Sequence, residues 1–347
     1  MINGKRLFAG IGCAALLSFP FCGSRAQHIS DVPDDVTSIA RWLSEQTANG
    51  IAFHTVSKSD QPTELTKGEM ELDLNAGLGF LPLNHKQFPE MQVDLLKERD
   101  VASLFSSEFN FPDATIHFRT GLYGRTSLGF KISDTTIPKR KVTESTSGKG
   151  QSNVLGLELK RYFLGRGRPL ISLSATADYV RGYFDFLNEF HNVTMGIATL
   201  NSNNTGELKW NIQSYGLETT VSGYLGPWMP FLGLGYNYNA GDVKTRIFAD
   251  FKGDTPDLDG RWSAPPTRHT MRISTGTRYG LRFMNLTLNG QMLAVGKGAG
   301  RTFAMNFGVS VPFNLKPGSR EYNQFQVRNK PEGKMVSNSF SALQILQ

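Results

Sequence analysis

The feature that most constrains the fold of this chain is a strict alternation of apolar and polar residues along several segments. From Phe303 to Phe313 the odd positions are all apolar, and the even positions between them are small, polar or proline. Residues 70–80 repeat the pattern, with apolar residues or Ala at the even positions and Asp, Glu, Asn or Gly at the odd ones. Successive side chains of a β-strand point to opposite faces, so a period of two indicates strands. These strands have two chemically different faces.

The length of the segments and their aromatic residues favour a membrane over a soluble sandwich. Strands of soluble proteins are most often about 5–6 residues long, whereas a tilted strand that crosses a membrane needs about 9–11. The alternating segments reach that longer class. Aromatic residues such as Phe80, Tyr179 and Trp228 flank the apolar faces. Tyr and Trp favour the boundary between lipid and water.

The order of the strands predicts a closed barrel. We expect about ten strands, with twelve as the alternative, at 68–83, 113–121, 125–133, 152–163, 169–183, 206–225, 229–242, 269–282, 285–296 and 301–313. The connections between them alternate between long and short, except for a short one near 298–300. Lipid cannot hydrogen-bond to the backbone, so the sheet must close on itself. The predicted fold class is therefore all-β, a closed antiparallel transmembrane β-barrel with an N-terminal helical segment.

Two places in this assignment have a second interpretation. Residues 115–132 could form one long strand, but Gly121, Gly124 and Arg125 favour a hairpin turn. Within 206–225 the apolar face changes parity between Ile212 and Tyr215, which predicts a β-bulge.

The N-terminus has the pattern of a secretory signal. Lys5 and Arg6 precede an apolar stretch from Leu7 to Phe21, and Ser24-Arg25-Ala26 supplies small residues for cleavage after Ala26. Both cysteines lie within residues 1–26, so the mature chain has none. This excludes disulfides, cysteine nucleophiles and cysteine-based metal sites.

Four segments follow from these patterns: a signal peptide at 1–26, a helical segment at 27–67, the barrel at 68–313 and a periplasmic tail at 314–347. Asp34 or Asp35 can cap a helix that runs to about Ala48, with Gly50 at its end. This helix could be a plug in the lumen, a periplasmic latch or a segment that rests against the base of the barrel. A second helical stretch is expected near 91–105.

If the apolar faces meet lipid, the polar faces fill the lumen. The charged side chains expected there are Glu69, Glu71, Asp73, His117, Arg119, Arg125, Lys131, Glu158, Lys160, Arg272, Arg278 and Arg282. They could line a transport path for a small solute. The interpretation we favour is a network of paired charges, because a narrow barrel of about ten strands is largely filled by side chains.

The sequence gives little support for catalysis or cofactors. Asp178, His191 and His269 fall near strand ends, but no nucleophile has a matching spacing. The six histidines lie far apart, without metal-ligand spacing. We therefore expect a non-enzymatic protein without cofactor or metal. A net charge of +7, three units of which lie within residues 1–26, does not indicate a nucleic-acid binder.

The signal, the Gly121–Gly124 hairpin, the 169–179 strand and the 229–236 segment MPFLGLGY together resemble Gram-negative outer-membrane β-barrel proteins. More specifically, they resemble a poorly characterised family of exported barrels with an N-terminal helix. The resemblance implies an outer-membrane location and contact with the barrel-assembly machinery, outer-membrane lipid and surface glycolipid. A basic stretch at Lys139–Lys141 could pair with glycolipid phosphates. The chain departs from such barrels by ending in Leu346-Gln347 instead of an aromatic residue of the last strand.

The expected function is passage of small or apolar solutes across the outer membrane. The alternative is a structural or adhesive surface barrel with a filled lumen, and a lipid-modifying barrel enzyme is the third and weakest interpretation.

Overall fold

The computed structural model describes residues 32–56, 63–92, 108–141, 146–164, 170–195, 198–251, 258–281 and 283–314. The predicted signal segment, nearly all of the predicted tail and Arg282 lie outside the described residues, as does the predicted second helical stretch beyond Gln92.

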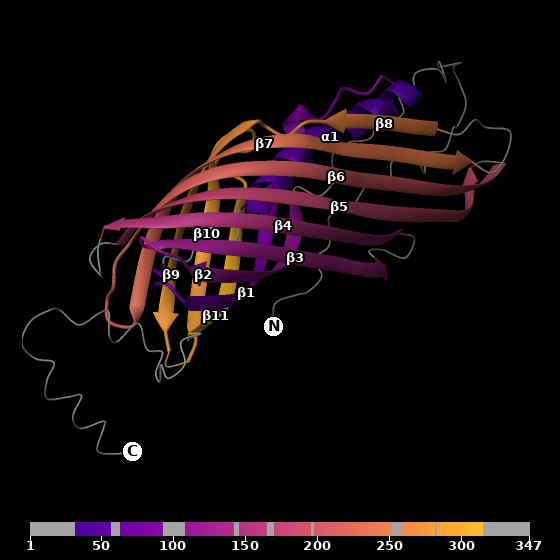
Figure 1. Cartoon of the computed structure of the whole chain (residues 1–347). Coiled ribbons are helices and arrows are strands. Elements are labelled where there is room, and N and C mark those ends of the chain that lie inside the picture. Colours follow the sequence, from indigo (N-terminus) through magenta and orange to yellow (C-terminus); the bar gives the residue numbers. More distant parts are fainter. Residues whose placement is uncertain are drawn as a thin grey trace, which may run out of the picture.

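The described chain consists of one α-helix followed by a series of strands (Figure 1). The helix is α1 (Val32–Val56), and a short 3-10 helix, η3 (His85–Gln87), follows β1. The strands are β1 (Glu69–Pro82), β2 (Glu108–Gly121), β3 (Thr126–Lys141), β4 (Thr146–Leu164), β5 (Leu170–Met195), β6 (Ala198–Ser222), β7 (Trp228–Phe251), β8 (Leu258–Ala264), β9 (His269–Gly280), β10 (Asn285–Val295) and β11 (Phe303–Asn314).

Ten of these strands close into an antiparallel barrel, in which β1 pairs with both β2 and β11, and β6 pairs with β7. The remaining strand, β8, pairs with the last part of β7, beyond the point where β7 stops pairing with β9. Every strand of the barrel therefore has a neighbour on both sides. This satisfies the backbone hydrogen bonds that lipid could not satisfy.

The predicted ten strands are confirmed, and so is the hairpin between β2 and β3. Its turn contains Gly124 and Arg125, both with positive φ, at 68° and 59°. The predicted long connections 134–151 and 184–205 are mostly wrong, because β3 to β6 extend through them. The extensions of β3, β4 and β6 are mainly polar, so they lack the alternation that marks a strand, yet the neighbouring backbone still pairs with them. The extension of β5 differs, because Phe184, Phe186 and Phe190 share one of its faces. β8 was not predicted either, and it lies within the predicted connection between residues 242 and 269.

The predicted bulge in β6 is also wrong. The pairing of β6 with β5 and β7 runs through residues 212–215 without a shift of register. Ile212 is fully buried inside the barrel, whereas Tyr215 is exposed on the outside. The apolar residues change parity because this part of the lumen is itself apolar, where it contacts α1.

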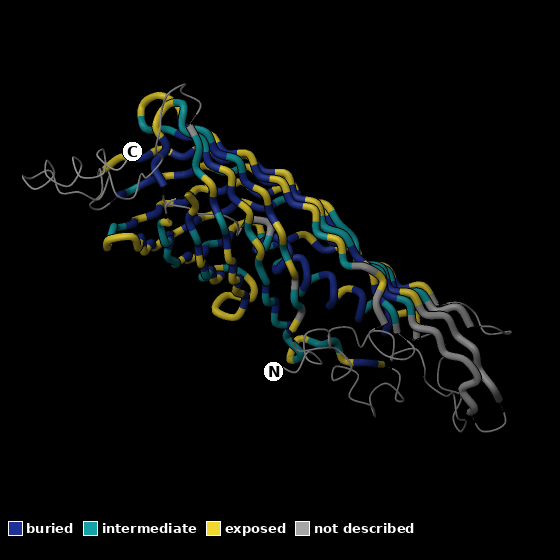
Figure 2. The backbone as a smooth tube through the Cα atoms, turned by 90° about the horizontal axis from the view of Figure 1, so that it is seen from below, coloured by how far each residue is buried: buried dark blue, intermediate teal, exposed yellow. Residues whose placement is uncertain are grey.

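The outside of the barrel is apolar, as predicted. Exposed and buried residues alternate along the strands (Figure 2), and the exposed set is dominated by large hydrophobic side chains. Leu74, Leu217 and Leu232 are 53%, 53% and 58% exposed. Such a surface is stable in hydrocarbon and would be unstable in water. Within the described part of the chain, no helix is both long enough and apolar enough to cross a membrane.

The barrel wall is taller on one side than on the other. β5, β6 and β7 have 24 to 26 residues, whereas β9, β10 and β11 have 11 or 12. We call the end with the turns at 122–125 and 223–227 the turn end. The opposite end, where β4 to β7 project and β8 is added, is the extended end (Figure 1).

Candidate functional site in the barrel lumen

The structure places nine of the twelve predicted lumen charges inside the barrel. These nine side chains are buried: Glu71, Asp73, His117, Arg119, Lys131, Glu158, Lys160, Arg272 and Arg278. Their strands alternate so that these charges share the inner face with Ser and Thr, while Leu, Ile and Phe share the outer one. The sequence pattern thus fixes the direction of each charge, and the barrel closure decides which charges meet.

Glu71 is the centre of the first group of ion pairs. Its side chain is fully buried, and its carboxylate accepts hydrogen bonds from Arg119 at 2.8 Å, Arg278 at 2.5 Å and the Ser310 hydroxyl at 2.5 Å. The partners come from β2 and β11, the two neighbours of β1, and from β9, so Glu71 connects four strands of the barrel wall. Arg119 also lies 3.3 Å from Asp73 through its Nε atom.

A second group surrounds His117 on β2. Its ring nitrogens lie 3.7 Å from the Asp73 carboxylate and 3.4 Å from that of Glu158. Glu158 also contacts Lys160 at 3.2 Å, and Lys131 contacts Asp178 at 2.6 Å.

Glycines on the inner face provide the room for this second group. A Cβ atom added at Gly129 would lie 2.5 Å from the His117 ring, and one at Gly156 would lie 2.1 Å from the Asp178 carboxylate. Any larger side chain at either position would displace an ion pair.

In a third group of ion pairs, Arg272 was predicted to face the lumen and its partner Glu218 was not. The guanidinium of Arg272 forms a two-atom contact with Glu218, and the Ser274 hydroxyl donates to the same carboxylate at 2.8 Å. Glu218 was not predicted, although it lies on the polar face of residues 215–221, opposite Tyr215 and Leu217. Asp178 lies on the polar face of the predicted strand 169–183, so the alternation alone would have identified it as a lumen residue.

The three remaining predicted lumen charges do not belong to these groups of buried ion pairs. Glu69 lies at the turn end, half-buried, where it accepts a hydrogen bond from the Thr66 backbone N–H at 2.6 Å. Arg125 lies in the β2–β3 turn and forms a two-atom contact with Glu64, at 2.7 and 3.0 Å. The Glu64 partner raises the pKa of Arg125 above its ordinary value. Arg282 lies outside the described residues.

The buried charges on the inner faces of the described strands balance. Five carboxylates, Glu71, Asp73, Glu158, Asp178 and Glu218, face five cations, Arg119, Lys131, Lys160, Arg272 and Arg278. A buried charge without a partner is very costly, whereas a hydrogen-bonded pair is tolerated. None of these strand charges therefore needs a counter-ion from outside the protein.

The other half of the lumen, toward the extended end, holds α1. Ala48, Ile51 and Ala52 of the helix pack against buried apolar residues of β4 to β7, among them Val180 and Trp210. Farther along, Phe53 contacts Leu293 and Ala304 of the low wall, on β10 and β11. The helix therefore touches both sides of the barrel interior.

Polar contacts fix the helix to the wall. The Ser44 hydroxyl donates to Thr245 on β7 at 2.7 Å, and the Asn49 side-chain oxygen accepts from the Thr267 backbone N–H at 2.9 Å. Near the start of the helix, Asp35 accepts from the Gln92 backbone N–H at 2.8 Å.

The predicted helix end near Ala48 was wrong, and Gly50 does not stop the helix. A Cβ atom at Gly50 would lie only 2.4 Å from Leu81. The glycine is therefore required for the close approach of α1 to β1, and α1 continues for one and a half turns beyond it, to Val56.

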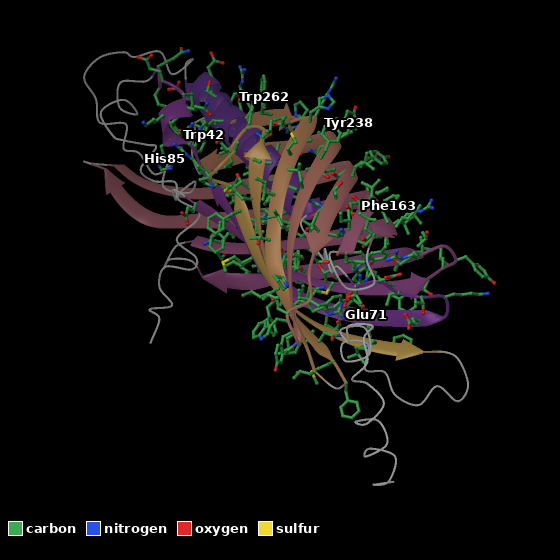
Figure 3. The ribbon with its side chains drawn as sticks, turned by 90° about the vertical axis from the view of Figure 1, so that its left-hand side faces the viewer. Trp42, Glu71, His85, Phe163, Tyr238 and Trp262 are labelled. Carbon is green, nitrogen blue, oxygen red and sulfur yellow. The ribbon has the colours of Figure 1, made fainter. Side chains whose placement is uncertain are left out.

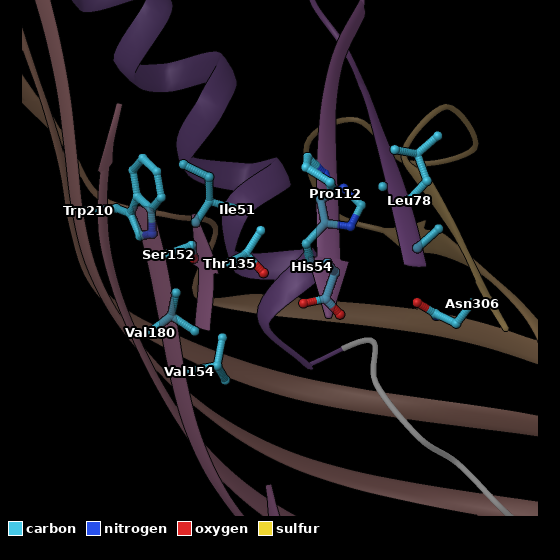
Figure 4. Close-up of a pocket in the computed structure, with 13 residues that line it drawn as sticks. Ile51, His54, Leu78, Pro112, Thr135, Ser152, Val154, Val180, Trp210 and Asn306 are labelled. Atoms are coloured by element: carbon cyan, nitrogen blue, oxygen red, sulfur yellow. The ribbon is translucent and has the colours of Figure 1, made fainter. Parts of the chain in front are cut away.

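A small cavity of about 50 Å³ lies beside the last turn of α1, between the helix and the barrel wall (Figure 4). Ile51, His54, Trp210 and Asn306 are among the residues that line it. It has room for a few water molecules at most.

The residues predicted to be possible catalytic partners are not brought together. Asp178 pairs with Lys131 in the lumen, whereas His269 lies on the exposed side with its Nδ1 2.6 Å from the Tyr236 hydroxyl. Nothing is described for the side chain of His191. Within the described segments, no group of three His, Cys, Asp or Glu residues is arranged to hold a metal ion.

Comparison with known proteins finds similarity in the fold. No protein-family model matches the chain, and no curated protein matches its sequence. Among solved structures, the translocator domain of the autotransporter NalP from Neisseria meningitidis is similar, with 12% identity and a TM-score of 0.43, over 80% of this chain and 99% of that one.

Two further barrels show lower similarity. The outer membrane protease OmpT from Escherichia coli has 11% identity and a TM-score of 0.38, over 75% of this chain and 100% of that one. A Pseudomonas aeruginosa FadL homologue has 7% identity and a TM-score of 0.31, over 81% and 98%.

The closed antiparallel sheet, its apolar outer surface and its charged interior lead to one conclusion about architecture. The chain is a transmembrane β-barrel of the kind found in outer membranes, with a helix from its own N-terminal region inside the lumen.

Proposed function

We propose that this protein is a non-enzymatic outer-membrane barrel whose lumen is closed in the resting state, so that it acts as a surface or structural barrel and not as an open pore. The observation that carries the proposal is the presence of two barriers in series. Paired charges fill the half of the lumen near the turn end, and α1 occupies the half near the extended end.

The two barriers are chemically different, which strengthens the proposal. A hydrated ion that entered from the turn end would have to separate pairs such as Glu71–Arg278 and Lys131–Asp178. Breaking a buried ion pair costs about 3–5 kcal/mol, so each such step is rare. From the extended end, the same ion would meet the apolar contact between α1 and β4 to β7.

Conductance in planar lipid bilayers tests this proposal. We expect the full-length barrel to insert without producing a steady ionic current. A variant that lacks residues 32–56 serves as the matched comparison, and we expect it to stay closed because the paired charges remain. A steady current through the unmodified protein would refute a closed resting state.

A second candidate function is gated passage of a small solute after α1 moves. It is favoured by one observation: a groove of about 730 Å³ separates part of α1 from the β10–β11 connection, so the helix is not packed tightly on all sides. Passage of this kind would require the ion pairs below the helix to rearrange as well.

A reversible crosslink distinguishes the two candidates. Ser44 and Thr245 touch through their hydroxyl groups, so S44C with T245C places two thiols where a disulfide would hold α1 against β7. Solute-driven swelling of proteoliposomes is then measured with and without reductant. Swelling that appears only after reduction would support gated passage, and the absence of swelling in both states would support the closed barrel.

A further inference from the structure

The large groove at the extended end has features that the closed-lumen proposal does not explain. It lies between the outward side of α1, the segment after β1 and the β10–β11 connection, and its volume is about 730 Å³. Pockets of about 300–1,000 Å³ are the usual size for small-molecule sites. Figure 3 shows Trp42 and His85 at this end of the barrel, far from Glu71.

The charge of the groove is unbalanced, unlike that of the lumen. Its lining contains three cations, Arg41, Lys297 and Arg301, and one carboxylate, Glu45. Glu45 is already paired with Arg41 at 2.9 Å. The side chains of Lys297 and Arg301 are exposed and form no ion pair with any residue in the described ranges. Two cations are therefore left to face the groove.

These two cations lie on a glycine-rich loop, residues 296–302, with the sequence GKGAGRT. Gly296, Gly298 and Gly300 have φ values of 131°, 86° and 73°, while the residues between them do not have positive φ. Alternating signs of φ are typical of loops whose backbone N–H groups turn toward one side, where an anion can bind. The N–H groups of residues 299–302 donate to carbonyls of the loop or of Leu293, and those of Lys297 and Gly298 take no part in these bonds.

The opposite wall of the groove is rich in amide side chains held in place by hydrogen bonds. Gln46 on α1 donates to Gln87 at 3.0 Å, and it accepts from the Asn84 backbone N–H at 3.3 Å. The indole N–H of Trp42 donates to the Asn84 carbonyl at 3.2 Å. Fixed amides recognise hydroxyl groups because each offers both a donor and an acceptor.

We propose that this groove binds a phosphorylated, hydroxyl-rich molecule of the size of a mono- or disaccharide. The phosphate is held by the side chains of Lys297 and Arg301 and by the backbone N–H groups of Lys297 and Gly298, and the sugar hydroxyls face Gln46 and Gln87. Such a ligand could be a free sugar phosphate or the headgroup of a phosphorylated glycolipid, because both present the same chemistry.

Calorimetric titration of the full chain in nonionic detergent tests the proposal. The probes are glucose 1-phosphate, unmodified glucose and a diphosphorylated disaccharide lipid in mixed micelles. We expect saturable binding of at least one phosphorylated probe and much weaker binding of glucose. Binding of both phosphorylated probes indicates a site open to free sugar phosphates, and binding of the lipid alone identifies a glycolipid headgroup as the source.

The double variant K297Q with R301Q should weaken phosphate binding by about a hundredfold, because each charge-assisted hydrogen bond contributes roughly tenfold in affinity. The matched control is K209Q with R181Q, which removes the same charge from exposed positions on β6 and β5 outside the groove. It should bind like the unmodified protein.

Three results would overturn the proposal. The first is the absence of saturable binding for both phosphorylated probes. The second is equal loss of affinity in the two double variants, which would indicate a general charge effect. The third is equal affinity for glucose and glucose 1-phosphate, which would remove the role of the cations.

Discussion

Glu71 is the residue whose substitution tests the filled interior most directly. The variant E71Q keeps the shape of the side chain and removes its charge. In the structure this carboxylate lies between the guanidinium groups of Arg119 and Arg278 and accepts from Ser310. An amide in its place can accept through only one oxygen, and its NH2 group points donors at cations that are themselves donors.

The magnitude follows from burial and from the number of partners. Glu71 is 0% exposed and both of its arginine partners are 1% exposed, so water cannot replace the lost interaction. Removing one partner of a buried ion pair costs about 3–5 kcal/mol. The matched variant is E69Q, on the same strand and the same face but half-buried at the turn end. An exposed interaction of that kind contributes at most about 1 kcal/mol.

The assay is urea unfolding of the full chain in detergent micelles, followed by the heat-dependent gel shift of folded barrels. We expect E71Q to lower the free energy of unfolding by about 3–5 kcal/mol and E69Q to change it by less than about 1 kcal/mol. Equal effects for the two variants would show that the charges at the turn half of the lumen are hydrated. The filled-interior argument would then fail.

Two further predictions concern β6, which faces α1 on one side and lipid on the other. Ile212→Ala should lower the free energy of unfolding by about 2–4 kcal/mol, because it leaves a cavity against α1. Leu217→Ala should lower it less, because lipid chains fill the space outside. Denaturant titration measures both variants, and a larger loss of stability for Leu217→Ala would contradict this prediction. Leu217→Arg should cost about 2–4 kcal/mol in a bilayer, because Leu217 lies on the apolar outer surface; folding yield into lipid vesicles measures this, and an unchanged yield would argue against a lipid-facing position.

Most of the fold could be predicted from the alternation of residue types, because each strand has lipid on one side and the lumen on the other. Leu74 and Asp73 are neighbours in sequence, and one faces outward while the other is buried inside. Only strands produce that separation over so many residues, and only a closed sheet can place the apolar side in lipid. The number of barrel strands and the direction of nearly all predicted lumen charges follow from this pattern alone.

The alternation did not predict the extent of a strand correctly where the strand no longer has lipid on one side. The extension of β6 beyond the apolar surface is mainly polar on both faces, so its pairing could not be recognised from the sequence. Ile212 shows the reverse case, since it is apolar yet faces the lumen. Its neighbours in space belong to α1, and the parity of β6 carries no information about a helix far away in the sequence.

The pairing of charges and the place of α1 were decided by tertiary structure only. Glu71 contacts Arg278, which is 207 positions away in the sequence, and Ser310, which is 239 positions away. The register between the strands places these three residues at the same level of the barrel. The helix was recognisable from its apolar stripe, but a plug, a latch and a resting segment require the same stripe. What placed it inside is the apolar patch contributed jointly by β4 to β7, a surface that exists only after the sheet has closed.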